Sequence, residues 1–183
     1  DMQLVKDLSV IKDLYLNTRP FPEILIIFFL LTYLYISYTS PKDIYYNYTG
    51  IMYQQGNPAV TEAFNIIIEG KYSKSLFANV DEFVGTIDLG DETVINCHLK
   101  FNRNHKAALE DIADLETSQN TYGLIYTDSI FQEFTIMKFE KAQNGEFLSD
   151  GWYISAPCTT REEAVQISNR LLRKELGDEF FVE

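Results

Sequence analysis

The sequence predicts an α+β fold: an N-terminal amphipathic helix and a single transmembrane helix, then a mainly antiparallel sheet of about six strands with a C-terminal helix packed on it. Three observations lead to this prediction. An uncharged apolar run fills residues 24–38, short runs of β-forming residues follow from residue 63, and a helix start signal stands at residues 160–163. Several strands in succession, followed by one helix, favour an α+β domain over a parallel α/β domain.

Residues 1–20 are expected to form a cytoplasmic amphipathic leader helix. Leu4, Leu8, Ile11 and Tyr15 recur at helical spacing, with Lys and Asp between them. Such a helix can lie on the inner leaflet of a membrane or pack against a partner. Whether further sequence precedes Asp1 is left open.

Residues 21–39 are predicted to form the transmembrane helix. The stretch is close to the roughly 20 residues that cross a bilayer core, and its run 24–38 holds no Gly, Pro or charged residue. A helix satisfies its own backbone donors and acceptors in lipid. The residues predicted to anchor the chain in the bilayer are Ile24, Leu25, Ile27, Phe28, Phe29, Leu31 and Tyr35.

Tyrosine gives a second indication of a membrane. Seven of the 12 tyrosines lie between Tyr33 and Tyr53, which is typical of the belt of aromatic side chains at the headgroup level. Two other interpretations of the apolar run stay open. It can be a buried helix or strand pair of a soluble domain, or the core of a cleaved secretory signal.

The charges that flank the run predict its orientation. Lys6, Lys12 and Arg19 precede it, whereas only Lys42 lies within about 20 residues after it. Since positively charged flanks stay in the cytoplasm, we expect a cell-membrane protein with a cytoplasmic N-terminus and its C-terminal domain outside.

The net charge of −12 belongs entirely to the sequence after Lys42, because residues 1–42 hold as many basic as acidic residues. Such a domain repels phosphate backbones, so nucleic acid is not an expected partner. Cationic partners and metal ions remain compatible with this charge.

Residues 40–61 are expected to form a tyrosine-rich neck without regular structure, because Pro41, Gly50, Gly56 and Pro58 interrupt it. Residues 62–183 are expected to form an acidic extracytoplasmic α+β domain. Its predicted strands cover 64–72, 83–89, 93–101, 122–127, 134–139 and 152–156, with a short helix over 105–116 and a loop over 143–151.

The closing helix has the clearest local signals in the chain. Thr160 and Glu163 match a capping box, Pro157 precedes the helix, and Gly177 is a typical stop residue. Arg173 and Lys174 near its end suit the helix dipole.

Cys97 and Cys158 are the two cysteines. They form either one disulfide outside the membrane or two free buried thiols. Asp88, Asp91 and Glu92 cluster in a turn, which is either a calcium site or an ordinary solvated turn. No cofactor is expected.

About half of the chain resembles a family of small membrane-anchored proteins of Gram-positive bacteria that have no assigned function. The residues that carry the resemblance are Phe83-Val-Gly-Thr-Ile, Tyr122-Gly-Leu-Ile-Tyr-Thr-Asp, Phe134-Thr-Ile, Ile154-Ser-Ala-Pro, Arg161-Glu-Glu-Ala and Ser168-Asn169. The resemblance implies an anchored extracytoplasmic α+β domain and supplies no activity and no site residues.

Catalytic motifs are not apparent in the sequence, which has no phosphate-binding glycine loop, nucleophile elbow or zinc-binding helix. A thiol or serine hydrolase that uses Cys158 or Ser155 with His98 or His105 is a remote alternative. We therefore expect a non-enzymatic, single-pass membrane-anchored accessory or binding protein, which assembles with another membrane protein and presents an acidic outer domain. The alternative is an acidic immunity protein that neutralises a basic toxin or peptide at the membrane.

Overall fold

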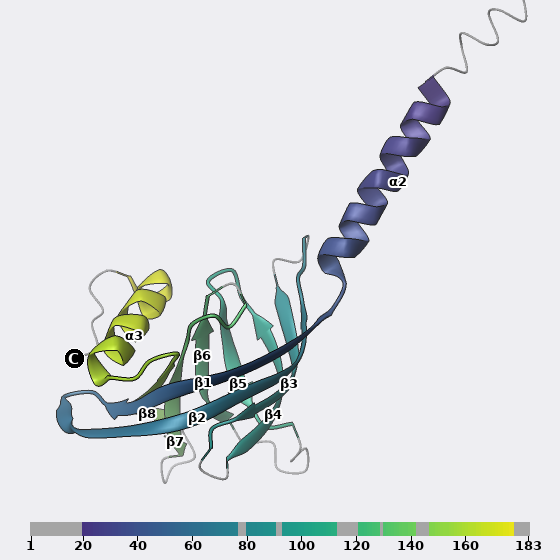
Figure 1. Ribbon diagram of the computed structural model, residues 1–183. Coiled ribbons are helices and arrows are strands. Elements are labelled where there is room, and N and C mark those ends of the chain that lie inside the picture. The colour runs from purple at the N-terminus through teal and green to yellow at the C-terminus, as the bar shows by residue number, and fades with distance from the viewer. Residues whose placement is uncertain are drawn as a thin grey trace, which may run out of the picture. The chain divides into compact units, whose positions relative to one another are not determined.

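A computed structural model describes residues 20–76, 80–90, 93–112, 121–128, 130–141 and 147–177 (Figure 1). The chain divides into two compact units, Asp1–Ser40 and Pro41–Glu183. The predicted leader helix and the acidic turn residues Asp91 and Glu92 lie outside the described residues.

The first described element is the helix α2, Pro20–Thr39, which confirms the helix predicted over 21–39. Its window Pro22–Thr39 is long and apolar enough to cross a membrane, and none of that window is buried within the structure. Pro20 and Pro22 stand in the first turn, where a missing backbone N–H costs no hydrogen bond. Thr32 and Thr39 donate their hydroxyl protons to carbonyl oxygens one turn back, at 2.8 and 2.9 Å.

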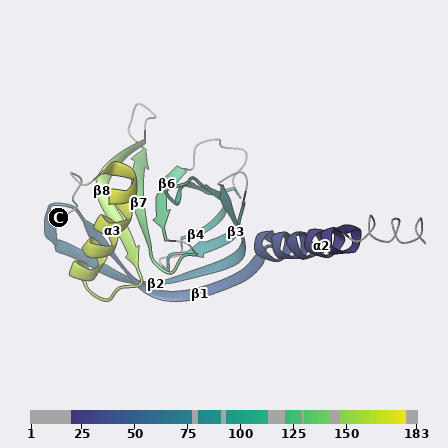
Figure 2. The same ribbon diagram turned by 90° about the horizontal axis from the view of Figure 1, so that it is seen from above.

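Eight antiparallel strands form one sheet in the second unit, in the order β4-β3-β2-β1-β8-β7-β6-β5. Strands that follow one another in sequence therefore pair, except β4 and β5, which stand at the two ends of this order, and the first strand pairs with the last. The end that follows β5 returns to β4, because Ile112 donates its backbone N–H to the carbonyl of Asn96 at 2.8 Å. The sheet is thus nearly barrel-shaped, as the view in Figure 2 shows. The strands are β1 Lys42–Gln54, β2 Asn57–Ser73, β3 Asp81–Asp88, β4 Val94–Phe101, β5 Lys106–Glu110, β6 Thr121–Thr127, β7 Phe134–Lys141 and β8 Phe147–Ala156.

A pair of glycines allows the wall to curve tightly between β2 and β3. Gly70 and Gly85 are directly opposite each other in the register. A Cβ on Gly85 would lie 2.1 Å from the carbonyl oxygen of Glu69, and one on Gly70 would lie 2.4 Å from that of Val84. No side chain fits at either position, so the two backbones approach closely where the sheet bends.

Side chains fill the inside of the barrel. They come from alternate positions of every strand, as the period of two requires. Phe131, between β6 and β7, sits among the rings of Phe83, Phe101 and Phe134 at centroid distances of 5.0, 5.6 and 6.4 Å. Barrels of eight strands hold either packed side chains or one small ligand, and the described side chains inside this one pack on one another. The buried members of this cluster are Ile66, Ile68, Tyr72, Phe83, Ile87, Leu89, Ile95, Cys97, Leu99, Phe101, Ala107, Leu109, Ile125, Phe131, Phe134, Ile136, Ile154 and Ala156.

The closing helix α3, Arg161–Leu176, covers part of the outside of the barrel. It packs on β1, β6, β7 and β8 (Figure 2). A second apolar cluster lies beneath it. This cluster consists of Ile51, Tyr53, Tyr126, Tyr153, Cys158, Ala164, Ile167, Leu171 and Leu172.

Both ends of α3 follow the predicted signals. The Thr160 hydroxyl accepts the backbone N–H of Glu163 at 3.3 Å, and Gly177 ends the helix with a φ of 88°. The Glu163 carboxylate accepts from Thr159, at 2.8 Å from its backbone N–H. The first of these bonds is the cap bond of a capping box, and the return bond to Glu163 comes from Thr159, one residue before the cap residue Thr160.

Four predictions about the second unit are corrected by the structure. The sheet has eight strands rather than about six. Residues 40–61 are not a loose neck, because β1 and the start of β2 pair continuously from Lys42↔Tyr72 to Tyr53↔Thr61. Residues 106–110 form β5 rather than part of a helix, since their pairing with β6 outweighs the helix propensity of Ala, Leu and Glu. The predicted loop over 143–151 also ends early, at the start of β8.

Candidate functional site

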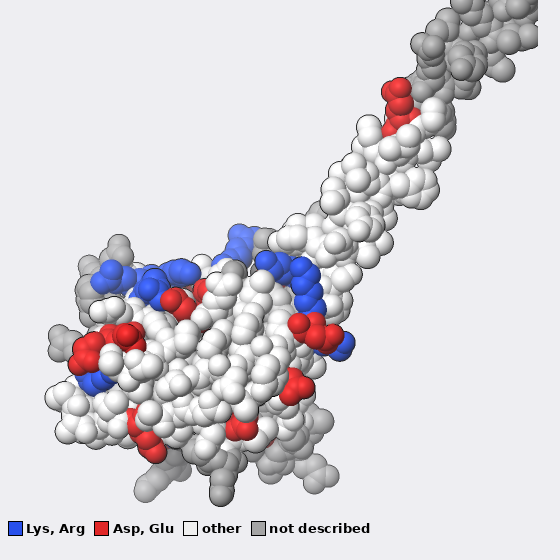
Figure 3. Space-filling model, in the orientation of Figure 1, with Lys and Arg blue, Asp and Glu red and all other residues white. Residues whose placement is uncertain are grey.

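Most of the large apolar side chains that are exposed among the described residues lie on α2. The predicted anchor residues Ile24, Phe28, Phe29 and Leu31 expose 61, 60, 66 and 60% of their surface. Leu25, Ile27 and Tyr35 of the same prediction are exposed as well. Glu23 in the first turn is the one charged residue of α2, and the rest of the helix is uncharged in Figure 3. Exposed apolar surface of this extent indicates a contact with lipid or with another protein.

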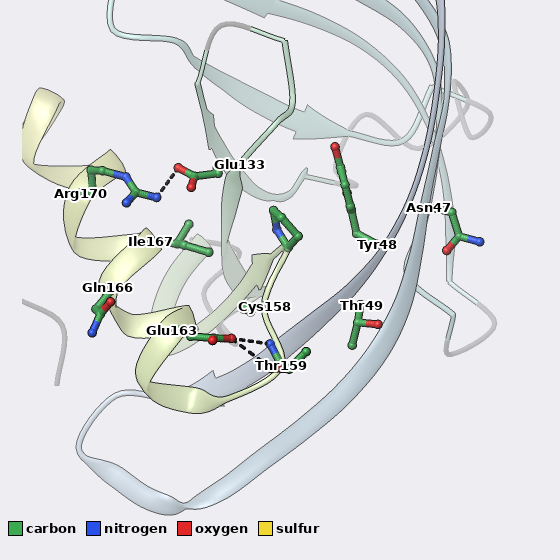
Figure 4. A pocket seen from close by; sticks show the side chains of 11 residues that line it. Asn47, Tyr48, Thr49, Glu133, Cys158, Thr159, Glu163, Gln166, Ile167 and Arg170 are labelled. Carbon is green, nitrogen blue, oxygen red and sulfur yellow. Dashed lines mark hydrogen bonds and ion pairs between the residues drawn. The ribbon is translucent and has the colours of Figure 1, made fainter.

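A groove of about 550 Å³ opens between α3 and β1 (Figure 4). Its floor is the turn Pro157-Cys158-Thr159, which carries the chain from β8 to α3. The residues that line it are Asn47, Tyr48 and Thr49 of β1, Glu133 before β7, Pro157, Cys158 and Thr159 of the turn, and Glu163, Gln166, Ile167 and Arg170 of α3.

The charges of the groove are mostly negative. Arg170 pairs with Glu133 across its upper end, and Glu163 lies at its lower end (Figure 4). Hydrogen bonds from the backbone and hydroxyl of Thr159, with a further one from Thr160, lower the pKa of Glu163, so this carboxylate is charged at neutral pH. Burial, with Tyr46 and Asp128 nearby, raises the pKa of Tyr48. Asp128 adds a third carboxylate close to the groove.

Ser155, a candidate nucleophile from the sequence, is a member of a buried polar cluster between the sheet and α3. Its hydroxyl is 2.8 Å from the hydroxyls of both Thr135 and Ser168, and Tyr53 donates to Ser168 at 2.6 Å. Ser155 and Ser168 have no solvent exposure. The cluster therefore joins α3 to the strands, and the Ser155 hydroxyl is buried within it.

Both cysteines are free buried thiols, which was one of the two alternatives that the sequence left open. Cys97 lies inside the barrel, and Cys158 lies under α3. Burial raises the pKa of Cys158 to about 11 and that of Cys97 to about 12. The Cys158 thiol donates to the carbonyl of Ser155 at 3.0 Å. At neutral pH both are protonated, which is the unreactive form of a thiol.

The two histidines lie away from the candidate nucleophiles. His98 faces Glu82 on the outside of the sheet, with Nε2 at 3.5 Å from the carboxylate. His105 lines a separate pocket with Ser75, Asp81 and other residues, and neither histidine lines the groove that Cys158 lines. Asp88 accepts the backbone N–H of Gly90 at 2.8 Å, which is an ordinary turn contact. Within the described ranges, no group of three His, Cys, Asp or Glu residues is placed to hold a metal ion.

The tyrosines of the predicted interfacial belt divide between two locations. Tyr33, Tyr35 and Tyr38 are exposed on α2, whereas Tyr53 is fully buried under α3. Tyr46 and Tyr48 stack on each other against the barrel core, with ring centroids 5.4 Å apart. The belt prediction is wrong for Tyr53, which is buried, whereas Tyr46 and Tyr48 are half-buried on the opposite face of β1.

Comparison of the chain with protein-family models, with curated proteins and with solved structures finds no match. The resemblance to membrane-anchored proteins of Gram-positive bacteria therefore stays an expectation, and the function has to be argued from the geometry.

The groove was not anticipated from the sequence. Its residues come from three segments that are far apart in the chain, and no single sequence motif spans the three. The one local signal was Pro157 between a predicted strand and a predicted helix, which marks the turn at its floor.

Proposed function

We propose that this chain is a single-pass protein of the cell membrane without catalytic activity. It holds its barrel domain at the outer face of that membrane and binds another membrane protein there. One observation carries the proposal. All described side chains of α2 from Pro22 on are exposed or half-exposed, and none packs into a core. A helix that is apolar on every side has no stable place in water, but it suits a bilayer core.

Membrane fractionation of the full chain tests the anchor. We expect the wild-type protein to stay in the membrane pellet after extraction with alkaline carbonate. The double variant Phe29→Arg and Leu31→Arg should leave the pellet or fail to accumulate, since two central arginines cost about 5 kcal/mol or more of insertion free energy. Val84→Arg, on the exposed outside of β3, is the matched control and should stay in the pellet. Release of the wild-type protein by carbonate would refute the anchor.

The orientation can be read with introduced cysteines, because both natural thiols are buried. A membrane-impermeant maleimide should label Thr61→Cys, on an exposed position of β2, in intact cells. Ser9→Cys should be labelled only after the membrane is permeabilised. The reverse pattern would place the barrel domain inside the cell.

Purification of the full chain in mild detergent tests the binding role. We expect a second membrane protein to co-purify in a fixed ratio. Migration of the wild-type chain alone, as a monomer, would contradict the accessory role and leave the anchor result unaffected.

A further inference from the structure

The strand β1 is longer than the strand that closes the barrel beside it. β1 pairs with β2 along its whole length, from Lys42 to Gln54. On its other side it pairs with β8 only from Ile51 to Gln54. One more bond follows, from the backbone N–H of Cys158 to the carbonyl of Thr49 at 3.0 Å, and the chain then turns away into α3.

The backbone groups that face this side of β1 can be assigned from that last bond. The N–H and C=O of one residue point to the same side of a strand, and successive residues alternate. Because the carbonyl of Thr49 faces β8, the backbone groups of Asn47, Tyr45 and Asp43 face the same way. Among the residues that the structure describes, none pairs with this edge, and all three side chains are exposed. The open edge extends about 15 Å at roughly 3.3 Å per residue.

The groove lies beside this open edge. Asn47, Tyr48 and Thr49 form its β1 side, and α3 and the turn Pro157-Cys158-Thr159 form the other sides (Figure 4). A volume of about 550 Å³ falls within the range of pockets that hold a ligand, roughly 300–1,000 Å³. Natural sheets usually cover or charge such an edge, because unpaired N–H and C=O groups invite another strand.

The charge of the groove selects among the possible strands. Three carboxylates, those of Asp128, Glu133 and Glu163, lie in or near it and meet one cation, Arg170, which is paired with Glu133. A segment that enters beside them is favoured if it carries Lys or Arg, and is disfavoured if it is acidic.

We propose that the open edge of β1, Asp43–Asn47, binds an extended, basic segment of a partner protein, which adds a strand to the sheet and places side chains in the groove. Main-chain hydrogen bonds to Tyr45 and Asn47 supply the register, and the carboxylates supply the preference for a basic sequence. This inference rests on the proposed role in partner binding and names the surface that performs it. It does not depend on the anchor.

A titration by nuclear magnetic resonance tests the proposal on the full chain in detergent micelles. The probe is a blocked seven-residue peptide of alternating valine and lysine, and the control peptide alternates valine and glutamate. The lysine peptide should shift the amide signals of Tyr45 and Asn47 and slow their hydrogen exchange. The glutamate peptide should leave both unchanged at the same concentration.

Two pairs of variants locate the binding. Asn47→Pro removes a donor from the open edge and leaves the ladder to β2 intact, so affinity should fall about tenfold, whereas Asn47→Thr should bind within about twofold of wild type. Gln166 is exposed on α3 and lines the groove. Gln166→Glu should strengthen binding and Gln166→Lys should weaken it, each about two- to fivefold, and this pair remains informative if the proline variant does not fold.

Three results would overturn the inference. The first is a lysine peptide that leaves the Tyr45 and Asn47 amides unchanged at millimolar concentration. The second is equal binding by Asn47→Pro and wild type, or by the two Gln166 variants. The third is protection of these amides from hydrogen exchange when the protein concentration is raised without peptide, together with dimers in a sedimentation experiment. That result would assign the edge to a second copy of the chain. None of these results affects the outcome of carbonate extraction. Failure of the proposal for the β1 edge can therefore be told apart from failure of the proposal for the membrane anchor.

Discussion

The hydroxyl of Ser168 offers a quantitative test of how α3 is held on the barrel. It accepts a hydrogen bond from the Tyr53 hydroxyl at 2.6 Å and lies 2.8 Å from the Ser155 hydroxyl and 3.2 Å from the Thr135 hydroxyl. All four residues are buried. Ser168→Ala removes these contacts and leaves the Tyr53 hydroxyl with Ser155 as its remaining hydrogen-bond partner. A buried hydroxyl that loses a partner costs about 1–3 kcal/mol, so we expect Ser168→Ala to lower the free energy of unfolding by about 2–3 kcal/mol.

Tyr53→Phe should cost less, because Ser168 then keeps its contacts to Ser155 and Thr135. One net hydrogen bond in a buried site contributes about 1 kcal/mol. In the Ser168→Ala background the same change should cost less, since the shared bond is already lost and only the contact with Ser155 remains. The two substitutions should therefore be coupled by about 1 kcal/mol rather than additive.

Urea unfolding of the full chain in detergent, followed by the fluorescence of the single tryptophan, Trp152, gives these free energies. Tyr45→Phe is the matched control, because it removes the same hydroxyl from a side chain that is 61% exposed. Its cost should stay within about 0.5 kcal/mol. Strict additivity of the two buried substitutions, or a Ser168→Ala cost no larger than that of the control, would refute the view that one hydroxyl joins the helix to the strands.

Three further predictions concern the same domain. Thr160→Ala should lower stability by about 1 kcal/mol in thermal melting, because the Thr160 hydroxyl accepts the backbone N–H of Glu163. Thr160→Ser should restore the stability. An unchanged melting temperature for the alanine variant would contradict this role. Gly85→Ala should cost about 3 kcal/mol or prevent folding, since its Cβ would lie 2.1 Å from the Glu69 carbonyl oxygen. Val84→Ala, at the neighbouring position, should fold normally. Equal expression and stability of the two variants would argue against the close approach of β2 and β3. Burial raises the pKa of Tyr126 to about 12 and that of Cys158 to about 11, above the 10.0 and 9.0 of the exposed groups, so the unfolded chain holds fewer protons above pH 9. This contribution to stability is complete below pH 9 and should be lost progressively up to about pH 12. The loss should be less steep in Tyr126→Phe. Urea midpoints that stay level across this pH range would contradict the burial of these groups.

Local signals account for the elements that the sequence predicts well. In β4, Ile95, Cys97, Leu99 and Phe101 alternate with polar residues, and every one of them points into the barrel. The start and the end of α3 follow from a cap and a glycine, which act within a few residues. These signals need no knowledge of the rest of the fold.

Two strands escaped prediction because their local signals point elsewhere. In β1 tyrosines occupy both sides of the strand: Tyr46 and Tyr48 face the core while Tyr45 faces outward, so the alternation is hidden. In β5 the run Lys-Ala-Ala-Leu-Glu is made of good helix formers. Only the pairing with β6, from Lys106↔Tyr126 to Glu110↔Thr121, makes it a strand.

The groove and the open edge could not be predicted for a different reason. Both exist because β8 ends at Ala156 while β1 continues alongside for several more residues. Strand lengths and their relative register are set by contacts across the whole sheet, so no window of sequence contains them.

The pairing of the first strand with the last has a consequence for synthesis of the chain. Ile51 meets Ser155 across the seam, with about 100 residues between them. A ribosome must therefore extend the chain from β1 to β8 before β1 finds this neighbour, and closing so large a loop is slow. If the nascent domain crosses a membrane as it is made, it emerges as an incomplete meander that closes only after β8 has followed the other strands.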